Sequence, residues 1–234
     1  MKLTLASTPI TVFLVDDHSV VREGYRRLLE RASDVRVIGE AGNAAEAYRE
    51  FQRLNPQVVV MDISLPGASG IEAMRHMLAR ESRAKVLIFS MHEELIFASR
   101  ALQAGAMGYV TKASAPEVLV EAVHSVAQGK RYISHDMAQA LALQAVGGGV
   151  ASLAALSNRE FEVMRLLVAG DTLNAIAEKL QLSYKTVANH QSAIRQKLGV
   201  ESHAQLIQVA QRTGVLPSVG DLQKQPLFKS EWVD

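Results

Sequence analysis

Residues 12–17 read Val-Phe-Leu-Val-Asp-Asp and residues 58–62 read Val-Val-Val-Met-Asp, so two apolar runs both end in acid. Short apolar runs of this kind are typical of strands that are buried on both faces of a sheet. If the two strands are parallel neighbours, their carboxyl ends bring Asp16, Asp17 and Asp62 to one place. Three clustered carboxylates repel one another unless a positive charge lies among them. The sequence therefore predicts a functional site at this edge of a sheet.

The first 130 residues alternate short apolar runs with amphipathic helical segments. We expect strands over 10–15, 35–38, 58–61, 86–89 and 108–111, and helices near 19–32, 44–54, 70–80, 94–104 and 115–128. In the first helix, Val20, Leu28 and Leu29 are expected on the inner face. Strands that are each followed by a helix predict an α/β fold, a doubly wound (βα)5 parallel sheet. Its functional crevice lies at the carboxyl ends of the strands, where the acids are found.

The rest of the chain is marked by helix starts and stops instead of strands. Two of the starts, Ser157 with Glu160 and Ser202 with Gln205, have the spacing of a capping box. The four expected helices begin after Ser157, Thr172, Ser183 and Ser202 and end near Gly170, Leu180, Gly199 and Gly214. These signals predict a small all-α domain. We place the first domain at 8–132, a linker at 133–152, the helical domain at 153–216 and a tail at 217–234.

Composition limits the classes of protein that remain. The chain has 234 residues, 48% of them hydrophobic, and a net charge of +1, so attraction to nucleic acid must be local. Disulfides and thiolate metal sites are excluded, because there is no cysteine. Residues 137–158 carry no charge, but Gln139, Gln144 and three consecutive glycines interrupt them. We therefore expect an interdomain connection there, no membrane association and a cytoplasmic location.

Two further residues fall at the same edge of the predicted sheet. Ser90 ends the fourth strand and Lys112 ends the fifth. Mg2+ prefers oxygen ligands and would relieve the repulsion between the carboxylates. A carboxylate beside Mg2+ and a lysine can attack a phosphoryl group, and the positive charges then neutralise the phosphoryl oxygens. The set predicts a site that forms an aspartyl phosphate.

The same residues give the first half a family resemblance. The matching stretches are Leu14-Val15-Asp16-Asp17-His18, Met61-Asp62-Ile63-Ser64-Leu65-Pro66-Gly67, Ser90 and Tyr109-Val110-Thr111-Lys112. Over residues 10–130 the chain resembles the receiver domain of two-component response regulators. The resemblance implies that Asp62 is the phosphoacceptor. It also implies a Mg2+ site formed by Asp17, Asp62 and the backbone carbonyl of Ser64, with Asp16 in support.

The resemblance implies roles for three more residues. Ser90 and Lys112 would contact the phosphoryl group, and Tyr109 would be the aromatic residue that moves inward on phosphorylation. Without the resemblance, Tyr109 could equally be ordinary strand packing.

The helix expected from Tyr184 lies in a stretch without acids. From Lys179 to Val200 there is no Asp or Glu, whereas Lys179, Lys185, Arg195 and Lys197 are basic. Spacing places Val187, Gln191, Ile194 and Leu198 inward, and Lys185, Ala188, Asn189, Ser192 and Gln196 outward. A short helix, a tight turn and then such a helix are typical of a helix-turn-helix that docks in the major groove. A solvated face on a helical bundle is the alternative.

Residues 153–214 are similar to the LuxR-type DNA-binding domain. The matching stretches are Leu156-Ser157-Asn158-Arg159-Glu160, Ile176-Ala177-Glu178, Leu182–Val187, His190 and Lys197-Leu198-Gly199-Val200. The resemblance implies DNA contacts by Lys185, Thr186, Ala188, Asn189, His190, Ser192 and Arg195. The chain departs from the family at Leu173-Asn174-Ala175, Ala188 and Gln191. An alanine in the groove can still contact a thymine methyl group.

Together the two halves resemble a NarL/FixJ-type response regulator. We expect a transcription factor, not an enzyme, in which a sensor histidine kinase phosphorylates Asp62 with Mg2+. Phosphorylation would favour a homodimer that binds double-stranded promoter DNA. The alternatives are a Mg2+-dependent phosphohydrolase and a DNA-binding protein that does not depend on phosphorylation. The first would need Asp-x-Asp after its first strand, whereas this chain has adjacent Asp16 and Asp17.

Overall fold

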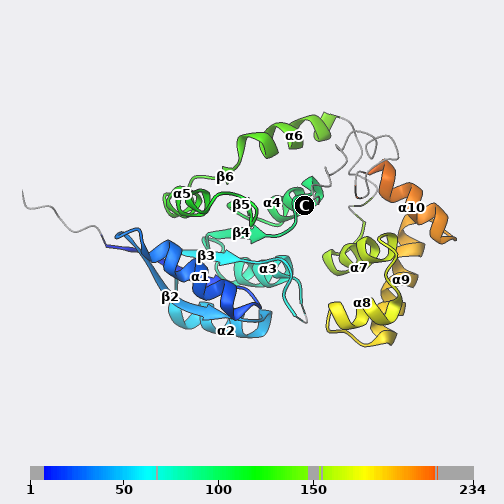
Figure 1. The fold of residues 1–234 in the computed structure, drawn as a ribbon, viewed down its shortest axis with the longest axis horizontal. Helices are drawn as coiled ribbons and strands as arrows, with labels where there is room; N and C mark the ends of the chain where they lie inside the picture. The colour runs from blue at the N-terminus through cyan, green and yellow to red at the C-terminus, as the bar shows by residue number, and fades with distance from the viewer. Residues whose placement is uncertain (1–7, 67, 147–152, 154, 214, 216–234) are drawn as a thin grey trace, which may run out of the picture. The chain divides into compact units, whose positions relative to one another are not determined.

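A computed structural model describes residues 8–66, 68–146, 153, 155–213 and 215 of the chain (Figure 1). The chain divides into two compact units, the first made mainly of residues up to 147 and the second mainly of the residues after it. The three glycines at 147–149 and the predicted tail lie outside the described residues. Within the part of the chain that the structure describes, no helix is both long enough and apolar enough to cross a membrane.

The first unit is a doubly wound α/β sheet, as the alternating pattern predicted. All described strands run parallel, in the order β2-β1-β3-β4-β5-β6. The strands are β1 (Ile10–Val15), β2 (Val35–Ala41), β3 (Val58–Met61), β4 (Val86–Ser90), β5 (Gly108–Thr111) and β6 (Tyr132–Ile133). The helices are α1 (Ser19–Glu30), α2 (Ala44–Leu54), α3 (Gly70–Arg80), α4 (Leu95–Gln103), α5 (Pro116–Ala127) and α6 (His135–Val146).

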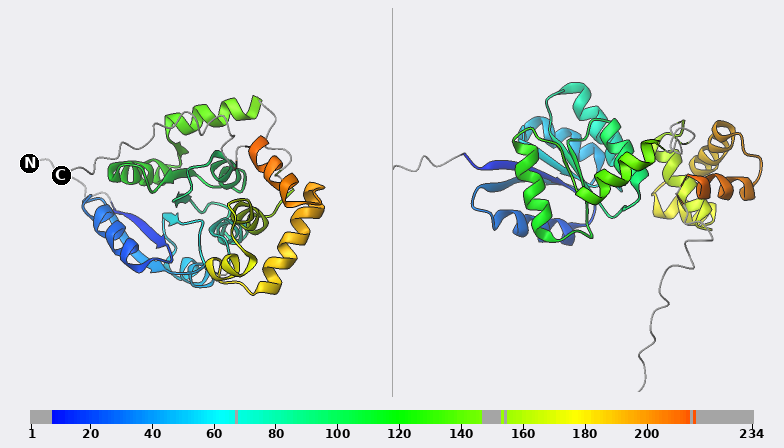
Figure 2. Two further views of the ribbon diagram at one scale, coloured as in Figure 1. Left: turned by 45° about the vertical axis from the view of Figure 1, so that its right-hand side comes forward. Right: turned by 90° about the horizontal axis from the view of Figure 1, so that it is seen from above.

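Helices cover both faces of this sheet (Figures 1 and 2). Val12 and Leu14 of β1 lie in one core cluster with residues of α1 and α5. Phe13, between them, faces the other side and lies near Leu54 of α2. This alternation explains why the strands are continuously apolar, since both faces of each strand are buried.

The structure adds a strand and a helix that the sequence analysis missed. β6 pairs parallel with β5, so the sheet has six described strands where five were predicted. A strand of two residues is too short to show the alternating hydrophobic pattern of a strand. Residues 135–146, within the predicted linker, form α6, which packs against α4. Its alanine- and leucine-rich sequence has high helix propensity, which the lack of charge obscured.

The predicted inner face of α1 is wrong at Val20. This side chain is 84% exposed, whereas Leu29 is fully buried and Leu28 is half-buried. Val21, Tyr25, Leu28 and Leu29 share the inner face at the 3.6-residue period. Residue 20 is rotated one position away from that face, in the first turn of the helix.

The second unit consists of α7 (Asn158–Val168), α8 (Leu173–Lys179), α9 (Tyr184–Leu198) and α10 (His203–Arg212). The starts follow the predicted caps. Ser157 with Glu160 and Ser202 with Gln205 form complete capping boxes, and Ser183 accepts from the Thr186 N–H at the start of α9. Gly199, with φ of +64°, ends α9 in a left-handed conformation.

Gly70 brings the start of α3 against the end of β3. A Cβ atom at this position would lie 1.8 Å from the Asp62 carbonyl oxygen, which belongs to the backbone and cannot rotate away. Gly24, on the exposed side of α1, has nothing within 4 Å of its Cβ position.

These two glycines give a matched prediction. Gly70→Ala should lower the free energy of unfolding by about 2 kcal/mol or more, because the backbone at Asp62 has to shift. Gly24→Ala should raise it by about 0.5–1 kcal/mol, because alanine is the better helix former. Urea unfolding of both variants measures this. Equal effects of the two substitutions would contradict the close approach at Gly70.

Candidate functional site

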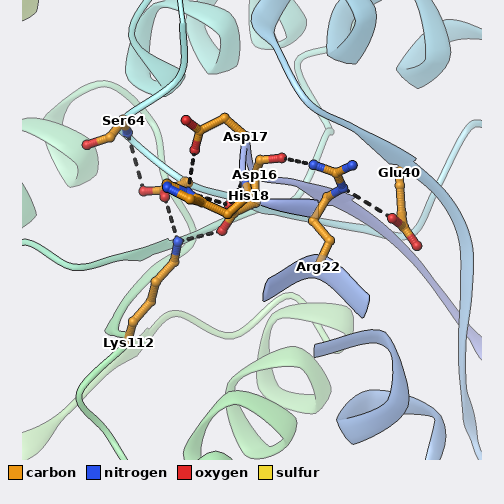
Figure 3. A network of polar contacts seen from close by, with 8 residues as sticks. Asp16, Asp17, His18, Arg22, Glu40, Ser64 and Lys112 are labelled. Atoms are coloured by element: carbon orange, nitrogen blue, oxygen red, sulfur yellow. Dashed lines mark hydrogen bonds and ion pairs between the residues drawn. The ribbon is translucent and has the colours of Figure 1, made fainter. Parts of the chain in front are cut away.

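One ammonium group joins two of the predicted acids at the carboxyl edge of the sheet (Figure 3). Lys112 Nζ lies 2.5 Å from Asp16 Oδ2 and 2.6 Å from Asp62 Oδ2. All three side chains are at most 8% exposed. Asp17, next in the chain, is more exposed and pairs with His18, Nδ1 to Oδ1, at 2.8 Å. The structure thus brings the three acids and Lys112 to one edge, as the strand order requires.

Backbone hydrogen bonds beyond the strand ends hold these residues in place. The Asp62 N–H donates to the Val15 carbonyl at 2.8 Å, and the Lys112 N–H donates to the Ser90 carbonyl at 2.8 Å. Each bond continues the pairing of two neighbouring strands by one residue. The chain order reverses at β1, between β2 and β3, which is where crevices form in open α/β sheets.

Burial and charge act in opposite directions on this site. Burial raises the pKa of Asp62, and the Lys112 ammonium opposes that effect without cancelling it. For Lys112, burial lowers the pKa, but Asp62 and Asp16 more than compensate, so its pKa is raised. Lys112 therefore stays charged, whereas an ionised Asp62 costs free energy. The single positive charge of Lys112 does not neutralise the negative charge of the three acids, so a second positive charge at this site would be stabilising.

The donor atoms suit a hard divalent cation. The side chains of Asp16, Asp17 and His18 lie close enough together to share one ion. Asp62 is outside that group among the described residues, and its carboxylate contacts Lys112 and the Ser64 N–H, which lies 3.3 Å from Asp62 Oδ1. Carboxylate oxygens are the ligands that Mg2+ prefers. Joint ligation by Asp17, Asp62 and the Ser64 carbonyl stays a prediction.

Ser90, the last residue of β4, and Tyr109, the second residue of β5, are both buried. Tyr109 is 1% exposed, and its hydroxyl donates to the His92 carbonyl at 2.7 Å. Burial raises the pKa of Tyr109 well above its ordinary value. The inward movement expected of Tyr109 is not available from this conformation, because the ring is already inside. Ser90 Oγ accepts from the His92 N–H at 3.3 Å and so faces the β4–α4 segment.

The sequence analysis missed two residues that contact this site. Arg22 donates to the Asp16 carbonyl and, at 3.1 Å, to Glu40, which ties α1 to the end of β2 (Figure 3). Burial would raise the pKa of Glu40, but Arg26 and Arg22 lower it overall. His92 contacts Ser64, Ser90 and Tyr109. By its sequence pattern, Arg22 is a charged residue on the solvated face of a helix. His92 lies in a segment that shows no hydrophobic periodicity.

The outward face of α9 carries the predicted DNA contacts. Lys185, Asn189, Ser192 and Arg195 are exposed, and Thr186, Ala188 and His190 are partly exposed. Val187 and Ile194 are buried, and Gln191 and Leu198 are half-buried, as predicted. Lys197, near the end of α9, forms an ion pair with Glu160 of α7 at 2.6 Å. It holds the helices together.

Comparison with known proteins identifies both units. Residues 12–124 match the response regulator receiver domain, and residues 154–210 match the luxR family of bacterial regulatory proteins. The chain is 41% identical to the transcriptional activator protein ExaE of Pseudomonas putida, over 88% of this chain and 97% of that protein. The chain belongs to the NarL/FixJ family of response regulators. It is thus a DNA-binding response regulator of a two-component system.

Other members of the NarL/FixJ family agree with this assignment. The response regulator UvrY of Escherichia coli (strain K12) is 37% identical over 88% of this chain and 95% of its own. RcsB of Salmonella enterica serovar Typhimurium, solved bound to promoter rprA in the presence of BeF3-, is 27% identical with a TM-score of 0.60, covering 86% of this chain and 98% of RcsB. The phosphohydrolase alternative loses support, because the second unit matches a family of regulators.

The charge imbalance at Asp62 makes a testable prediction. Because burial raises its pKa in the folded state, Asp62 favours the fold more when it is protonated than when it is ionised, and this contribution is lost as the pH rises through the folded pKa. Asp62→Asn should therefore raise the melting temperature at pH 7, by roughly 2–5 °C. The gain should shrink as the pH falls through the raised folded pKa of Asp62 and should be gone below about 4, where the wild-type carboxyl is protonated in both the folded and the unfolded state.

Mg2+ provides the matching control. It should raise the melting temperature of the wild type more than that of Asp62→Asn, since the variant lacks one carboxylate. A variant less stable than the wild type at pH 7 without Mg2+ would show that the Lys112 ion pair outweighs the burial of charge.

Proposed function

We propose that a sensor histidine kinase phosphorylates this response regulator on Asp62 and thereby controls its binding to promoter DNA. The observation that supports this most directly is the buried Asp62 carboxylate, with the Lys112 ammonium at 2.6 Å. An Asp62 oxygen would attack the phosphorus of a phosphohistidine, and the bond from phosphorus to the histidine nitrogen would break. Lys112 would then neutralise charge on the phosphoryl oxygens.

A bound Mg2+ would supply further positive charge at this site. Asp17 and Asp62 with the Ser64 carbonyl would hold it, and Asp16 would support it. Before transfer, Lys112 bridges Asp16 and Asp62. Phosphorylation would shift Lys112 toward the phosphoryl group and weaken its bond to Asp16.

Ser90 is the residue that would change its hydrogen bond on phosphorylation. Its hydroxyl now accepts from the His92 N–H and would turn to the phosphoryl oxygens. The β4–α4 segment would lose one of its anchors, while Tyr109 stays inside. A local charge would thus bias the arrangement of α4, against which α6 packs. We infer that this favours a homodimer, which binds paired half-sites about one helical turn apart.

The second unit, within residues 153–216, would bind the major groove through α9. Lys185, Ala188, Asn189 and Ser192 follow the spacing i, i+3, i+4, i+7 and so form one stripe. Ser192 donates to the Ala188 carbonyl at 3.1 Å, and Thr186 bonds to Ser183 at 2.8 Å. The Asn189 amide has no hydrogen-bond partner among the described residues and can donate to and accept from one adenine. His190 and Arg195 flank this stripe.

A phosphodonor experiment tests the input. Incubation with phosphoramidate and Mg2+ should add one phosphoryl group per chain, seen by mass spectrometry, and none in Asp62→Asn. Asp34→Asn is the matched control, because Asp34 is an exposed acid paired with His124. Sedimentation should show the phosphorylated wild type shifting toward a dimer. An adduct that persists in Asp62→Asn would rule out Asp62 as the acceptor.

Binding to promoter fragments selected from genomic DNA tests the output. Lys185→Ala with Asn189→Ala should weaken binding by about 1–3 kcal/mol per lost base contact, and wild-type binding should fall steeply with salt. The control Gln52→Ala with Arg53→Ala removes the same kinds of group from exposed positions of α2 and should bind as the wild type does. Equal binding by both double variants would place the DNA surface elsewhere.

A further inference from the structure

His92 reaches from the β4–α4 segment to the segment that follows the phosphoacceptor. Its side-chain Nε2 lies 3.1 Å from Ser64 Oγ, and the residue is 8% exposed. Ser64 follows Asp62 by two positions, and its N–H donates to Asp62 Oδ1 at 3.3 Å. Two segments that belong to different strands are thus joined by one side-chain hydrogen bond beside the site.

The backbone of His92 is hydrogen-bonded to Ser90 and Tyr109, two residues that are expected to respond to phosphorylation. Its N–H donates to Ser90 Oγ at 3.3 Å, and its carbonyl accepts from the Tyr109 hydroxyl at 2.7 Å. One residue therefore contacts Ser64 through its ring and Ser90 and Tyr109 through its backbone. A change in the hydrogen bond of Ser90 has to act on the residue that is bound to Ser64.

The ring of His92 has little freedom to turn away from Ser64. It stacks on Phe97 of α4, with the ring centres 3.9 Å apart and an angle of 9° between the planes. Phe97 is 2% exposed, so it is fixed in the core. Nδ1 faces Glu94 Oε2 at 3.9 Å. Stacking and the Ser64 bond together connect the start of α4 with the segment around Asp62.

We propose that His92 is a positioning residue that couples the Ser64 segment to the Ser90 segment. This inference rests on the proposed phosphorylation of Asp62, because Ser64 bonds to Asp62 and Ser90 is the proposed contact of the phosphoryl group. The bond to His92 limits the movement of Ser64 and therefore of its carbonyl, which is the proposed Mg2+ ligand. In return, binding at Asp62 fixes His92 and with it the first turn of α4.

The alternative is that His92 only fills space and that its bond to Ser64 has no effect on the site. Substitutions at both ends of the bond distinguish the two. Ser64 is exposed, so Ser64→Ala removes the hydroxyl, keeps the backbone carbonyl and disturbs no core packing. His92→Gln keeps an amide N–H that can reach Ser64, whereas His92→Ala removes the ring and its stacking.

The test measures binding of beryllofluoride with Mg2+ to the full chain by calorimetry. Ser64→Ala and His92→Ala should each weaken binding by about three- to tenfold, the effect of one net hydrogen bond. The double variant should bind about as weakly as His92→Ala, because the two residues share one bond. His92→Gln should recover most of the affinity. His124→Ala, which removes a histidine bonded to Asp34, should bind as the wild type does.

Hydrogen exchange without metal or phosphodonor gives an independent readout. Ser64→Ala should speed exchange in the 91–97 segment, although residue 64 belongs to another strand connection. Additive losses in the double variant, or a Ser64→Ala variant with unchanged affinity and exchange, would reduce His92 to packing. If His92→Ala does not fold, Ser64→Ala decides the question alone. If the wild type itself does not bind beryllofluoride with Mg2+, the proposed function is contradicted instead.

Discussion

Charge balance in a buried crevice is the constraint on which the first unit depends. The ammonium of Lys112 is shared between the carboxylates of Asp16 and Asp62, all of them nearly inaccessible to water. Burial raises the pKa of Asp62 in spite of this ammonium. A buried acid whose charge is not fully compensated lowers the stability of the fold. Such an arrangement is expected at a site that binds a cation and a phosphoryl group. The order of the strands places these groups at one edge of the sheet.

The same crevice restricts how the protein can respond. Tyr109 is already inside and bonded to His92, so the ring has no further inward path. Ser90 bonds to the same residue and can exchange that bond for one to a phosphoryl oxygen. Under the proposed phosphorylation, the response would begin as an exchange of hydrogen bonds in the β4–α4 segment, and α4, with α6 packed on it, would transmit it.

The second unit uses its few basic residues for two purposes. Lys197 binds Glu160, and this bond with those from Ser157 lowers the pKa of Glu160 although burial acts against it. The pair joins the end of α9 to the start of α7 and sets the angle at which α9 is presented. Lys185 and Arg195 remain exposed. In a nearly neutral chain, these two exposed charges lie on the helix that we propose to contact DNA.

The sequence by itself determined five of the six described strands, the helix caps, the acids at the strand ends and the two-part organisation. Such features are encoded locally, in apolar runs, in cap residues and in glycines. Tertiary structure alone decided that Lys112 bridges two acids, that Lys197 binds Glu160, that His92 reaches Ser64 and that Val21 replaces Val20 on the inner face. These four polar contacts join residues from 28 to 96 positions apart. Polar side chains pair with groups that are near in space, and pairs between residues that are distant in the sequence leave no periodic pattern in it.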